Sequence, residues 1–370
     1  MRLYPALRPF LFRLDAEAAH GWGVRAASLG RWAGPLLRRA FPPPDARLAQ
    51  TLWGLPFAGP VGLAAGFDKD ARLADVWPTL GFGFAEVGSV TARPSDGNPR
   101  PRAFRLPDDR ALVNRMGLNN AGAQATAHRL AGLDRDARRA RGFVLAVNVA
   151  KTHSPDILGD AGVDDFRETV RHVLPHADLL VLNVSCPNTA EGKTFETPDA
   201  LDALLTAVMA EHGAQASPVP VLVKLSPPAA SGVDAPLVDE LVALALSHGV
   251  AGFVATNTAS DRDGLATDAR RLSQIGAGGL SGRPLATRAT ALVRHLYRTV
   301  GDRVPIVGVG GVDSAEAAYA RLRAGASLVE LYTGLVYEGP GLPSQIHAGL
   351  VRLLDRDGLG RLADAVGLDA

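Results

Sequence analysis

Polar and glycine residues follow each of eight short apolar runs in the sequence. Residues of these types hold cofactors, bind substrates or transfer protons. They are Gly66, Lys69, Ser89, Asn148, Asn183, Cys186, Lys224, Thr256, Asn257, Gly310, Gly311, Tyr332, Thr333 and Gly334. If the runs are parallel strands of a barrel, all of these ends meet at one face, where barrel enzymes carry their active sites. One such residue would be weak evidence, whereas the full set predicts a functional site.

Two glycine-containing segments predict a phosphate site. Gly310-Gly311 and Thr333-Gly334 follow the last two runs, and the loops after strands seven and eight of a barrel often bind phosphate. Glycine lets the backbone approach closely and direct its N–H groups at an anion. Tight turns alone would also explain these glycines, but two such loops after the expected pair of strands favour phosphate.

Asparagines at or beside the run ends indicate a neutral ring as a ligand. They are Asn114, Asn148, Asn183, Asn188 and Asn257. An amide side chain both donates and accepts hydrogen bonds, which suits a ring of alternating C=O and N–H groups. Asparagine is also common in loops, but an unsatisfied amide after a buried strand would be costly. A protease or phosphatase site would more often show histidine or paired carboxylates.

Two lysines and the single cysteine complete the candidate site. Lys69 and Lys224 end buried runs, so each needs an anionic partner, either on a ligand or from a structural acid such as Glu86. Cys186 follows a strand end in a polar loop. Buried cysteines are usually inert packing, but a thiol in this position can act as a general base if its pKa is lowered towards the working pH.

The elements that must position these residues alternate along the chain. The apolar runs are nearly continuous, which is typical of strands covered on both faces in a parallel sheet. They cover residues 61–65, 84–87, 144–148, 179–184, 219–225, 252–256, 305–309 and 328–332, with helical stretches between them at 201–211, 236–247, 286–299 and 314–324. This alternation predicts an α/β fold, a (β/α)8 TIM barrel rather than a doubly wound sheet. Residues 99–106 are expected in an excursion at the top of the barrel.

We expect residues 1–44 to form an N-terminal helical extension and residues 45–370 to form the barrel. Asp15 is a good N-cap for a helix that runs through Trp22, and a second helical stretch around Leu36 ends at the three prolines that begin at Pro42. The extension is either a cap packed on the barrel or an apolar, arginine-rimmed surface in a membrane interface. The residues by themselves favour the cap.

The composition excludes several classes of protein. The chain has 39 basic and 38 acidic residues, which argues against a general binder of nucleic acid. Its single cysteine excludes an intrachain disulfide and a cysteine-based zinc site, and we expect no metal. The N-terminus lacks the pattern of a signal peptide, and no run approaches the about 18 apolar residues of a membrane span. No obligatory protein partner is evident.

Together these residues match a known family, because the chain resembles the dihydroorotate dehydrogenases. Its layout looks like the class 2, quinone-linked, membrane-associated branch. The likeness runs from the N-terminal helices to Leu335. The matching segments are residues 64–69, 98–106, 114–117, 185–189, 255–258, 278–285 and 308–314. So many ordered matches are highly specific.

The resemblance implies an FMN-dependent oxidation of dihydroorotate to orotate in pyrimidine biosynthesis. A base removes a proton from C5 of the substrate, a hydride passes from C6 to N5 of the flavin, and a quinone reoxidises the flavin. The residues implied for FMN are Ala65, Gly66, Lys69, Ser89, Asn148, Asn183, Lys224, Thr256, Gly279, Gly311, Tyr332 and Thr333. Those implied for dihydroorotate are Lys69, Asn114, Arg115, Met116, Gly117, Leu118, Asn183, Asn188, Asn257 and Thr258.

The resemblance also implies a quinone tunnel under the N-terminal helices, with His20, Arg105 and Tyr332 at positions that match its lining. This favours the membrane interpretation of residues 1–44 over the cap, with the protein attached peripherally to the cytoplasmic side of the inner cell membrane.

Three positions depart from the class 2 pattern. Cys186 stands where class 2 has serine, as in the soluble class 1 enzymes, Leu118 replaces an aromatic residue, and Glu191-Gly192-Lys193 lacks the usual Pro-Gly-Leu-Arg. The alternatives are therefore a related flavin barrel that uses a soluble acceptor or another dihydropyrimidine, and a non-catalytic, membrane-bound binding barrel. A phosphate-binding isomerase barrel without flavin would explain the glycines but neither the asparagines nor Cys186.

Overall fold

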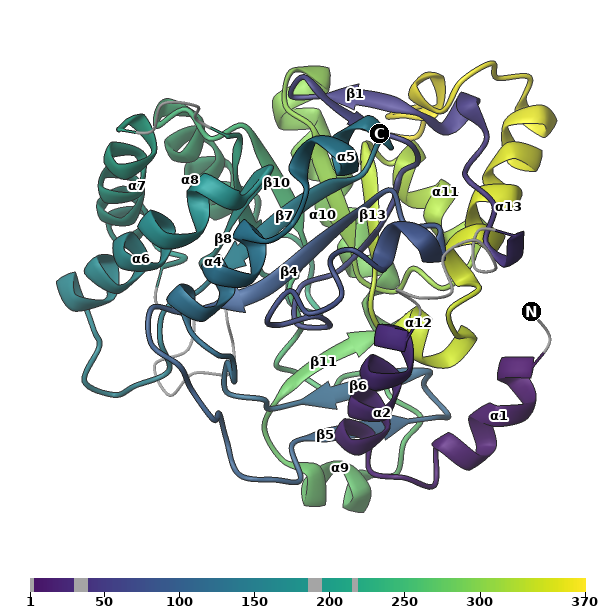
Figure 1. Ribbon diagram of the computed structural model, residues 1–370, viewed down its shortest axis with the longest axis horizontal. Helices are drawn as coiled ribbons and strands as arrows, with labels where there is room; N and C mark the ends of the chain where they lie inside the picture. The colour runs from purple at the N-terminus through teal and green to yellow at the C-terminus, as the bar shows by residue number, and fades with distance from the viewer. Residues whose placement is uncertain (1–2, 30–38, 186–194, 215–218) are drawn as a thin grey trace.

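Eight parallel strands close into a barrel in the computed structural model, which describes residues 3–29, 39–185, 195–214 and 219–370 (Figure 1). In order around the barrel the strands are β3 (Val61–Leu63), β4 (Phe84–Val90), β7 (Val144–Val149), β8 (Leu179–Asn183), β9 (Val221–Leu225), β10 (Gly252–Ala255), β12 (Ile306–Val309) and β13 (Leu328–Leu331). Each strand coincides with one predicted apolar run. The prediction of a closed (β/α)8 barrel is confirmed.

The strands are apolar on both faces because both faces are covered. Every residue of β7, β8, β9 and β10 is buried. One set of side chains, which includes Phe84, Val144 and Leu222, fills the inside of the barrel. The alternate set packs outward against the helices. The parallel register places Asn183 of β8 beside Lys224 of β9, so strands far apart in sequence end together.

Helices surround the barrel, as the intervals between the runs predict (Figure 1). They are α4 (Ala123–Ala131), α5 (Arg135–Ala140), α6 (Asp160–Val173), α7 (Pro198–Gly213), α8 (Ala235–Ser247), α10 (Ala286–Val300), α11 (Ala315–Arg323), α12 (Thr333–Glu338) and α13 (Leu342–Asp357). Helix α6 buries Phe166, Val170 and Val173 on one face, the spacing of an amphipathic helix. Short 3₁₀ helices lie at Ala46–Leu48, Trp77–Leu80, Leu174–His176, Arg283–Leu285, Gly301–Arg303 and Leu362–Ala365.

A hairpin of β1 (Gln50–Leu52) and β2 (Leu55–Phe57) covers the amino-terminal end of the barrel strands. The ring of Phe57 meets the ring of Phe84 edge-on at 5.8 Å, and Trp53 Nε1 donates to Ala251 O at 2.8 Å. The sequence analysis did not predict this hairpin, because its strands are only three residues long. It excludes water from one end and leaves the opposite end for ligands.

A second small sheet stands at the carboxyl-terminal end of the barrel. It joins β5 (Ala103–Leu106), β6 (Ala111–Asn114) and β11 (Gly279–Gly282), and α9 (Ala269–Ile275) lies beside it (Figure 1). The excursion expected at residues 99–106 is therefore present as part of this sheet. Its third strand pairs Gly279 with Asn114, a contact that spans more than half of the barrel sequence.

The N-terminal helices α1 (Leu3–Leu11) and α2 (Ala16–Leu29) lie at this same end (Figure 1). Asp15 Oδ1 accepts the backbone N–H of Ala18 at 2.9 Å, which confirms the predicted N-cap. Helix α2 buries none of its described residues, and its main anchor is Glu17, which accepts Arg102 Nη2 at 2.7 Å. The predicted second stretch, which includes Leu36, lies largely outside the described residues.

Large apolar side chains on these two helices and in the segment between them remain exposed. They are Leu7, Phe10, Leu14, Trp22 and Leu29. Among the described residues, no helix has the length and hydropathy needed to cross a bilayer.

Candidate active site

A pocket with about 1010 Å³ of empty space opens among the carboxyl-terminal ends of the barrel strands. Its walls come from the loops after β3, β6, β10, β12 and β13, from the ends of β4, β8 and β9, and from β6 and β11. This volume includes the solvent at the open mouth of the pocket. A ligand bound there would contact residues from most of the barrel strands at once.

Most of the residues predicted for the site line this single pocket. They are Ala65, Gly66, Lys69, Ser89, Asn114, Met116, Leu118, Asn183, Lys224, Thr256, Asn257, Thr258, Gly311, Tyr332 and Thr333. Cys186 and Asn188 lie outside the described residues, so the predicted base remains a prediction from sequence. The convergence that the strand-end pattern predicts is present in the described part of the chain.

Four other predicted residues lie beside the pocket rather than on its wall. Asn148 is fully buried beneath it. Gly279 packs against Thr258, and a Cβ at this position would lie 2.1 Å from Thr258 Oγ1. Gly117 packs against Asn98 in the same way.

The fourth residue is Arg115. Its guanidinium donates to the backbone oxygens of Ile275 and Pro101, and it stacks over the ring of Phe104. Arg115 therefore fastens the small sheet instead of reaching into the pocket.

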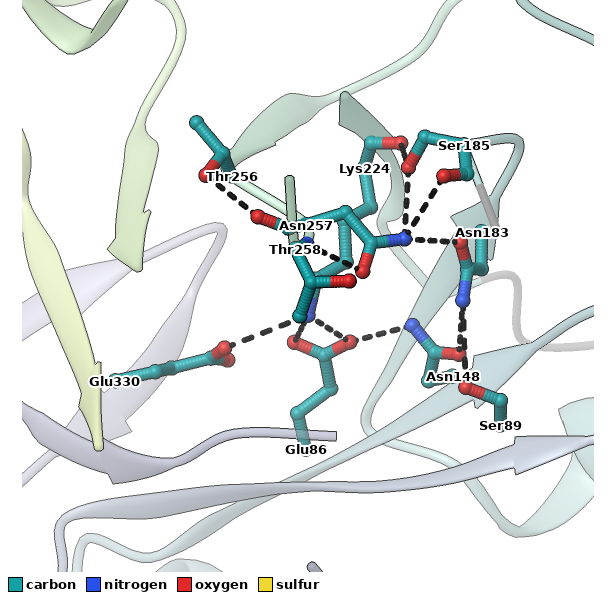
Figure 2. A network of polar contacts seen from close by, with 10 residues as sticks. All are labelled: Glu86, Ser89, Asn148, Asn183, Ser185, Lys224, Thr256, Asn257, Thr258 and Glu330. Atoms are coloured by element: carbon teal, nitrogen blue, oxygen red, sulfur yellow. Dashed lines mark hydrogen bonds and ion pairs between the residues drawn. The ribbon is translucent and has the colours of Figure 1, made fainter. Parts of the chain in front are cut away.

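The amides form one connected network across the barrel strands (Figure 2). Asn257 Nδ2 donates to Asn183 Oδ1 at 3.1 Å and to Ser185 Oγ at 3.0 Å. Asn183 Nδ2 in turn donates to Ser89 Oγ at 3.3 Å and to Asn148 Oδ1 at 3.5 Å. These bonds hold the side chains in fixed orientations, which prepares their remaining donors and acceptors for a ligand.

The floor of the pocket holds a buried lysine between two carboxyl groups (Figure 2). Lys224 Nζ lies 3.1 Å from Glu86 Oε1 and 3.7 Å from Glu330 Oε2. Burial opposes the charge of Lys224, but Glu86 and Glu330 outweigh it and raise its pKa. The structural partner considered for Lys224, Glu86, is confirmed. Glu330 was missed because it stands inside an apolar strand.

The two carboxyl groups differ in their contacts. Glu86 accepts Lys224 with both oxygens and Asn148 Nδ2 at 2.5 Å, whereas Glu330 Oε2 has no hydrogen-bond partner in the described part of the chain. Burial, followed by the negative charge of Glu86, raises the pKa of Glu330 well above its usual value. Glu330 is therefore the less well compensated of the two carboxyl groups.

Lys69 reaches the pocket from the loop after β3. Asp68 anchors this loop, because its carboxylate accepts the backbone N–H of Arg72 at 2.7 Å and of Leu73 at 2.8 Å. The ammonium of Lys69 donates to Asn119, which also lines the pocket and was not predicted. Burial, and next the charge of Arg102, lower the pKa of Lys69 to about 8. The negative charge of a ligand carboxylate would offset both effects and stabilise the ammonium form of Lys69.

The two predicted phosphate loops line the same pocket. Gly310 and Gly311 have φ angles of 107° and 75°, which other residues adopt only with strain. Ser281, which was not predicted from the sequence, shares a hydrogen bond of 2.8 Å with Thr333, so it joins β11 of the small sheet to the start of α12. The pocket therefore has glycine backbone and hydroxyl groups at the position predicted for phosphate.

An aromatic chain connects the pocket to the N-terminal helices. The ring of Phe67 lies 5.3 Å from Tyr332 and 4.7 Å from His20, both edge-on. Phe67 was not singled out from the sequence, although it stands within the matching segment 64–69. Burial, and next the charge of Lys69, lower the pKa of His20 to about 4, so its ring is neutral at pH 7.

Arg105, the third residue of the predicted tunnel, connects the small sheet to α1 and the segment that follows it. It donates to Leu14 O at 2.8 Å and lies over the ring of Phe12 at 4.8 Å. His20 thus belongs to the N-terminal segment and Arg105 contacts it, whereas Tyr332 lines the main pocket.

Comparisons with known proteins place this site in a family. The family model of dihydroorotate dehydrogenase matches residues 47–354. The dihydroorotate dehydrogenase (quinone) of Deinococcus deserti is 48% identical, over 98% of this chain and 99% of that protein. That of Mycobacterium ulcerans is 45% identical, over 100% of this chain and 98% of that protein.

A solved structure agrees with these relatives. The structure of the Eimeria tenella protein in complex with ferulenol superposes with a TM-score of 0.85 at 34% identity, over 96% of each chain. The sequence matches, the fold and the position of the pocket therefore agree, and the chain belongs to the dihydroorotate dehydrogenase family.

Proposed function

We propose that the protein oxidises dihydroorotate to orotate with FMN and passes the electrons to a quinone, in de novo pyrimidine biosynthesis. One observation carries this proposal: an amide network and a lysine with a lowered pKa share one pocket at the mouth of the barrel. The relatives named as quinone-dependent enzymes, which align over nearly the full chain, support the choice of acceptor.

The residues of the pocket fit FMN in three respects. The Gly310–Gly311 loop has the backbone conformation of an anion site. Lys224 offers a positive charge on the floor, and Thr258 Oγ1 is a buried hydroxyl without a partner in the described residues. Bound FMN would supply the redox chemistry, since it can take up a hydride and later release two electrons.

The pocket-lining residues that would hold FMN come from seven barrel strands or the loops that follow them. They are Ala65, Gly66, Ser89, Asn183, Lys224, Thr256, Gly311, Tyr332 and Thr333. Lys224 Nζ lies closer to Glu86 than to Glu330, at 3.1 Å against 3.7 Å. Its ammonium group would stabilise negative charge that develops above the floor of the pocket.

For the substrate, Lys69 would bind the carboxylate of dihydroorotate, and amides would bind its ring. Asn114, Asn183 and Asn257 line one pocket with Lys69, and the bonds between Asn183 and Asn257 fix which amide atoms face a ligand. Cys186 would accept the proton from C5 of the substrate. Its position after β8, in the same chain segment as Asn183, supports this role.

The quinone would approach from the membrane through the N-terminal helices. Residues 1–44 would form the membrane-associating extension, on the cytoplasmic side of the inner membrane, and residues 45–370 the catalytic barrel. The side chains of Phe10, Trp22 and Leu29 support this assignment because they are large, apolar and exposed in the described part of the chain. His20 and Arg105 would line the path towards Tyr332.

The decisive test is an anaerobic titration of the purified, flavin-containing protein with dihydroorotate. We expect the flavin absorbance to bleach and then to return on addition of a quinone, but not of fumarate. Reoxidation by fumarate alone would overturn the choice of acceptor and favour the soluble-type alternative. A failure of dihydroorotate to bleach the flavin would overturn the substrate assignment.

Substitution of Lys69 should weaken substrate binding in a pH-dependent way. Below a pKa of about 8 Lys69 is charged, and above it the ammonium loses its proton, so the KM for dihydroorotate of the parent enzyme should rise above pH 8. Lys69→Arg keeps a charge and should flatten this rise, whereas Lys69→Met should raise the KM at all pH values, by roughly tenfold or more. Steady-state kinetics at saturating quinone measure both effects. A parent KM that is constant from pH 7 to 9 would contradict the assignment.

Substitution of Cys186 should change the pH profile of substrate oxidation. A thiol is more acidic than a hydroxyl group, so in Cys186→Ser the alkaline rise of the rate of flavin reduction should move to higher pH. Cys186→Ala should slow this step by about 10²–10⁴-fold, the usual contribution of a general base. Stopped-flow reduction of the flavin isolates the step from the reaction with quinone. An unchanged profile in Cys186→Ser would exclude Cys186 as the base.

Removal of the acid group at Glu330 should stabilise the protein at neutral pH. Because its pKa is raised in the folded state, both states are protonated at low pH, and only the unfolded state ionises as the pH rises. The folded protein therefore loses stability with increasing pH. The free energy of unfolding of Glu330→Gln should exceed that of the parent at pH 7, with a difference that shrinks towards pH 4.

Urea unfolding at several pH values measures this difference. Glu240→Gln, at an exposed position of α8, is the matched control. If Glu330→Gln is less stable than the parent at pH 7, Glu330 is ionised in the folded protein.

A further inference from the structure

Arg321 of α11 is a fully buried arginine whose guanidinium meets only neutral groups. Its Nη2 donates to Gly310 O at 2.7 Å and to Ala286 O at 3.1 Å. Its Nη1 donates to Val309 O at 3.1 Å, and its Nε to Thr290 Oγ1 at 3.1 Å. The residue is 1% exposed, and no carboxylate pairs with it in the described part of the chain.

Such an arrangement is unusual because a buried charge normally has a counter-charge. Burial lowers the pKa of Arg321 to about 10, so the group is still charged at neutral pH. The neighbouring strand makes room for it: a Cβ at Gly308 would lie 2.5 Å from Cγ of Arg321. The fold thus accommodates a cation here without supplying an anion.

The hydrogen bonds of Arg321 also determine how the glycine loop is oriented. The carbonyl oxygens of Val309 and Gly310 face the guanidinium. In a trans peptide the N–H points opposite to the C=O, so the N–H groups of Gly310 and Gly311 face away from Arg321. Both glycines line the pocket. Arg321 therefore stands behind the loop, and the loop's donors face the other way.

The wall around this loop carries no free cation of its own among the described residues. Its lining includes Ser281, Leu285, Val312 and Thr333, all neutral, and the two lysines that line the pocket belong to other loops and strands. An anion on the loop would therefore find its nearest uncompensated positive charge in Arg321, through one layer of backbone.

We propose that Arg321 is a positioning residue that acts as the built-in counter-charge for a phosphate monoester on the Gly310–Gly311 loop, and so selects FMN over riboflavin. This rests on the proposed function only in that the cofactor is a flavin. Arg321 does not touch the phosphate. It holds two peptide groups with their donors directed at the phosphate, and its charge stabilises the dianion in a region of low dielectric constant.

The test compares the affinities of the full-length apoprotein for FMN and for riboflavin, measured by quenching of flavin fluorescence. Arg321→Gln keeps a hydrogen-bonding side chain but removes the charge. It should weaken FMN binding by roughly tenfold or more, the size of a charge–charge interaction through protein, and change riboflavin binding much less. Arg298→Met, on the exposed face of α10, alters the net charge equally and is the matched control.

A lysine at the same position provides a second test that retains the charge. Because burial lowers the pKa of lysine readily, Arg321→Lys should prefer FMN at pH 7 and lose this preference as the pH rises to 9. The parent should keep its preference over the same range. This comparison remains decisive if Arg321→Gln does not fold.

The outcomes separate this inference from the proposed function. If both flavins lose affinity equally in Arg321→Gln, or if the preference of Arg321→Lys does not change with pH, the role of Arg321 is only structural and the inference is wrong. If the parent apoprotein binds neither flavin, the FMN assignment falls as well. The binding assay contains no dihydroorotate, so a failure of substrate oxidation would leave this result unaffected.

Discussion

The ion pair between Lys224 and Glu86 is the interaction on which the site depends. The two residues stand on β9 and β4, which are not neighbours in the barrel, so their contact at 3.1 Å spans its interior. A closed barrel normally fills this space with apolar side chains. Here the layer nearest the mouth is polar, and hydrogen bonds connect most of its members: Glu86 accepts from Asn148, and Asn148 accepts from Asn183.

The electrostatics of the pocket depend on which of its charged side chains are paired within the protein. The protein neutralises one lysine internally and leaves positive charge at two other places, Lys69 beside the mouth and Arg321 behind the glycine loop. Both are poorly solvated, so each is stabilised when an anion arrives. A ligand with a carboxylate and a cofactor with a phosphate would meet these two charges at separate ends of one pocket. The amides between them suit the neutral part of a ring.

The N-terminal helices are attached by a different kind of interaction. No residue of helix α2 is fully buried, and the pair of Glu17 with Arg102 fixes its position. The partly buried side chains of Val24 and Ala27 also pack against the core. Helix α1 is held through Tyr4, whose hydroxyl donates to Val336 O. The larger apolar side chains of both helices stay exposed and form an apolar surface on the outside. The aromatic chain from His20 through Phe67 to Tyr332 then links that surface to the pocket.

The barrel and the composition of its mouth could be predicted from local patterns along the chain. Eight apolar runs, each followed by polar or glycine residues, are a local pattern, and the closure of parallel strands brings their ends together in only one way. Lys69, Asn183, Lys224 and Gly311 could therefore be assigned to one site in advance. The cap at Asp15 was equally local, since a side chain bonds to a backbone three residues away.

Which charges are compensated could not be predicted in this way and is visible only in the folded chain. Glu330 and Arg321 lie within an apolar strand and on the buried side of a helix, so a periodicity of apolar residues does not distinguish them from packing. Their importance depends on what lies across the barrel or behind a loop, at distances of a few ångströms between residues far apart in the chain. Pairing of this kind is a property of the fold, because electrostatic energy depends on separation in space rather than on separation in sequence.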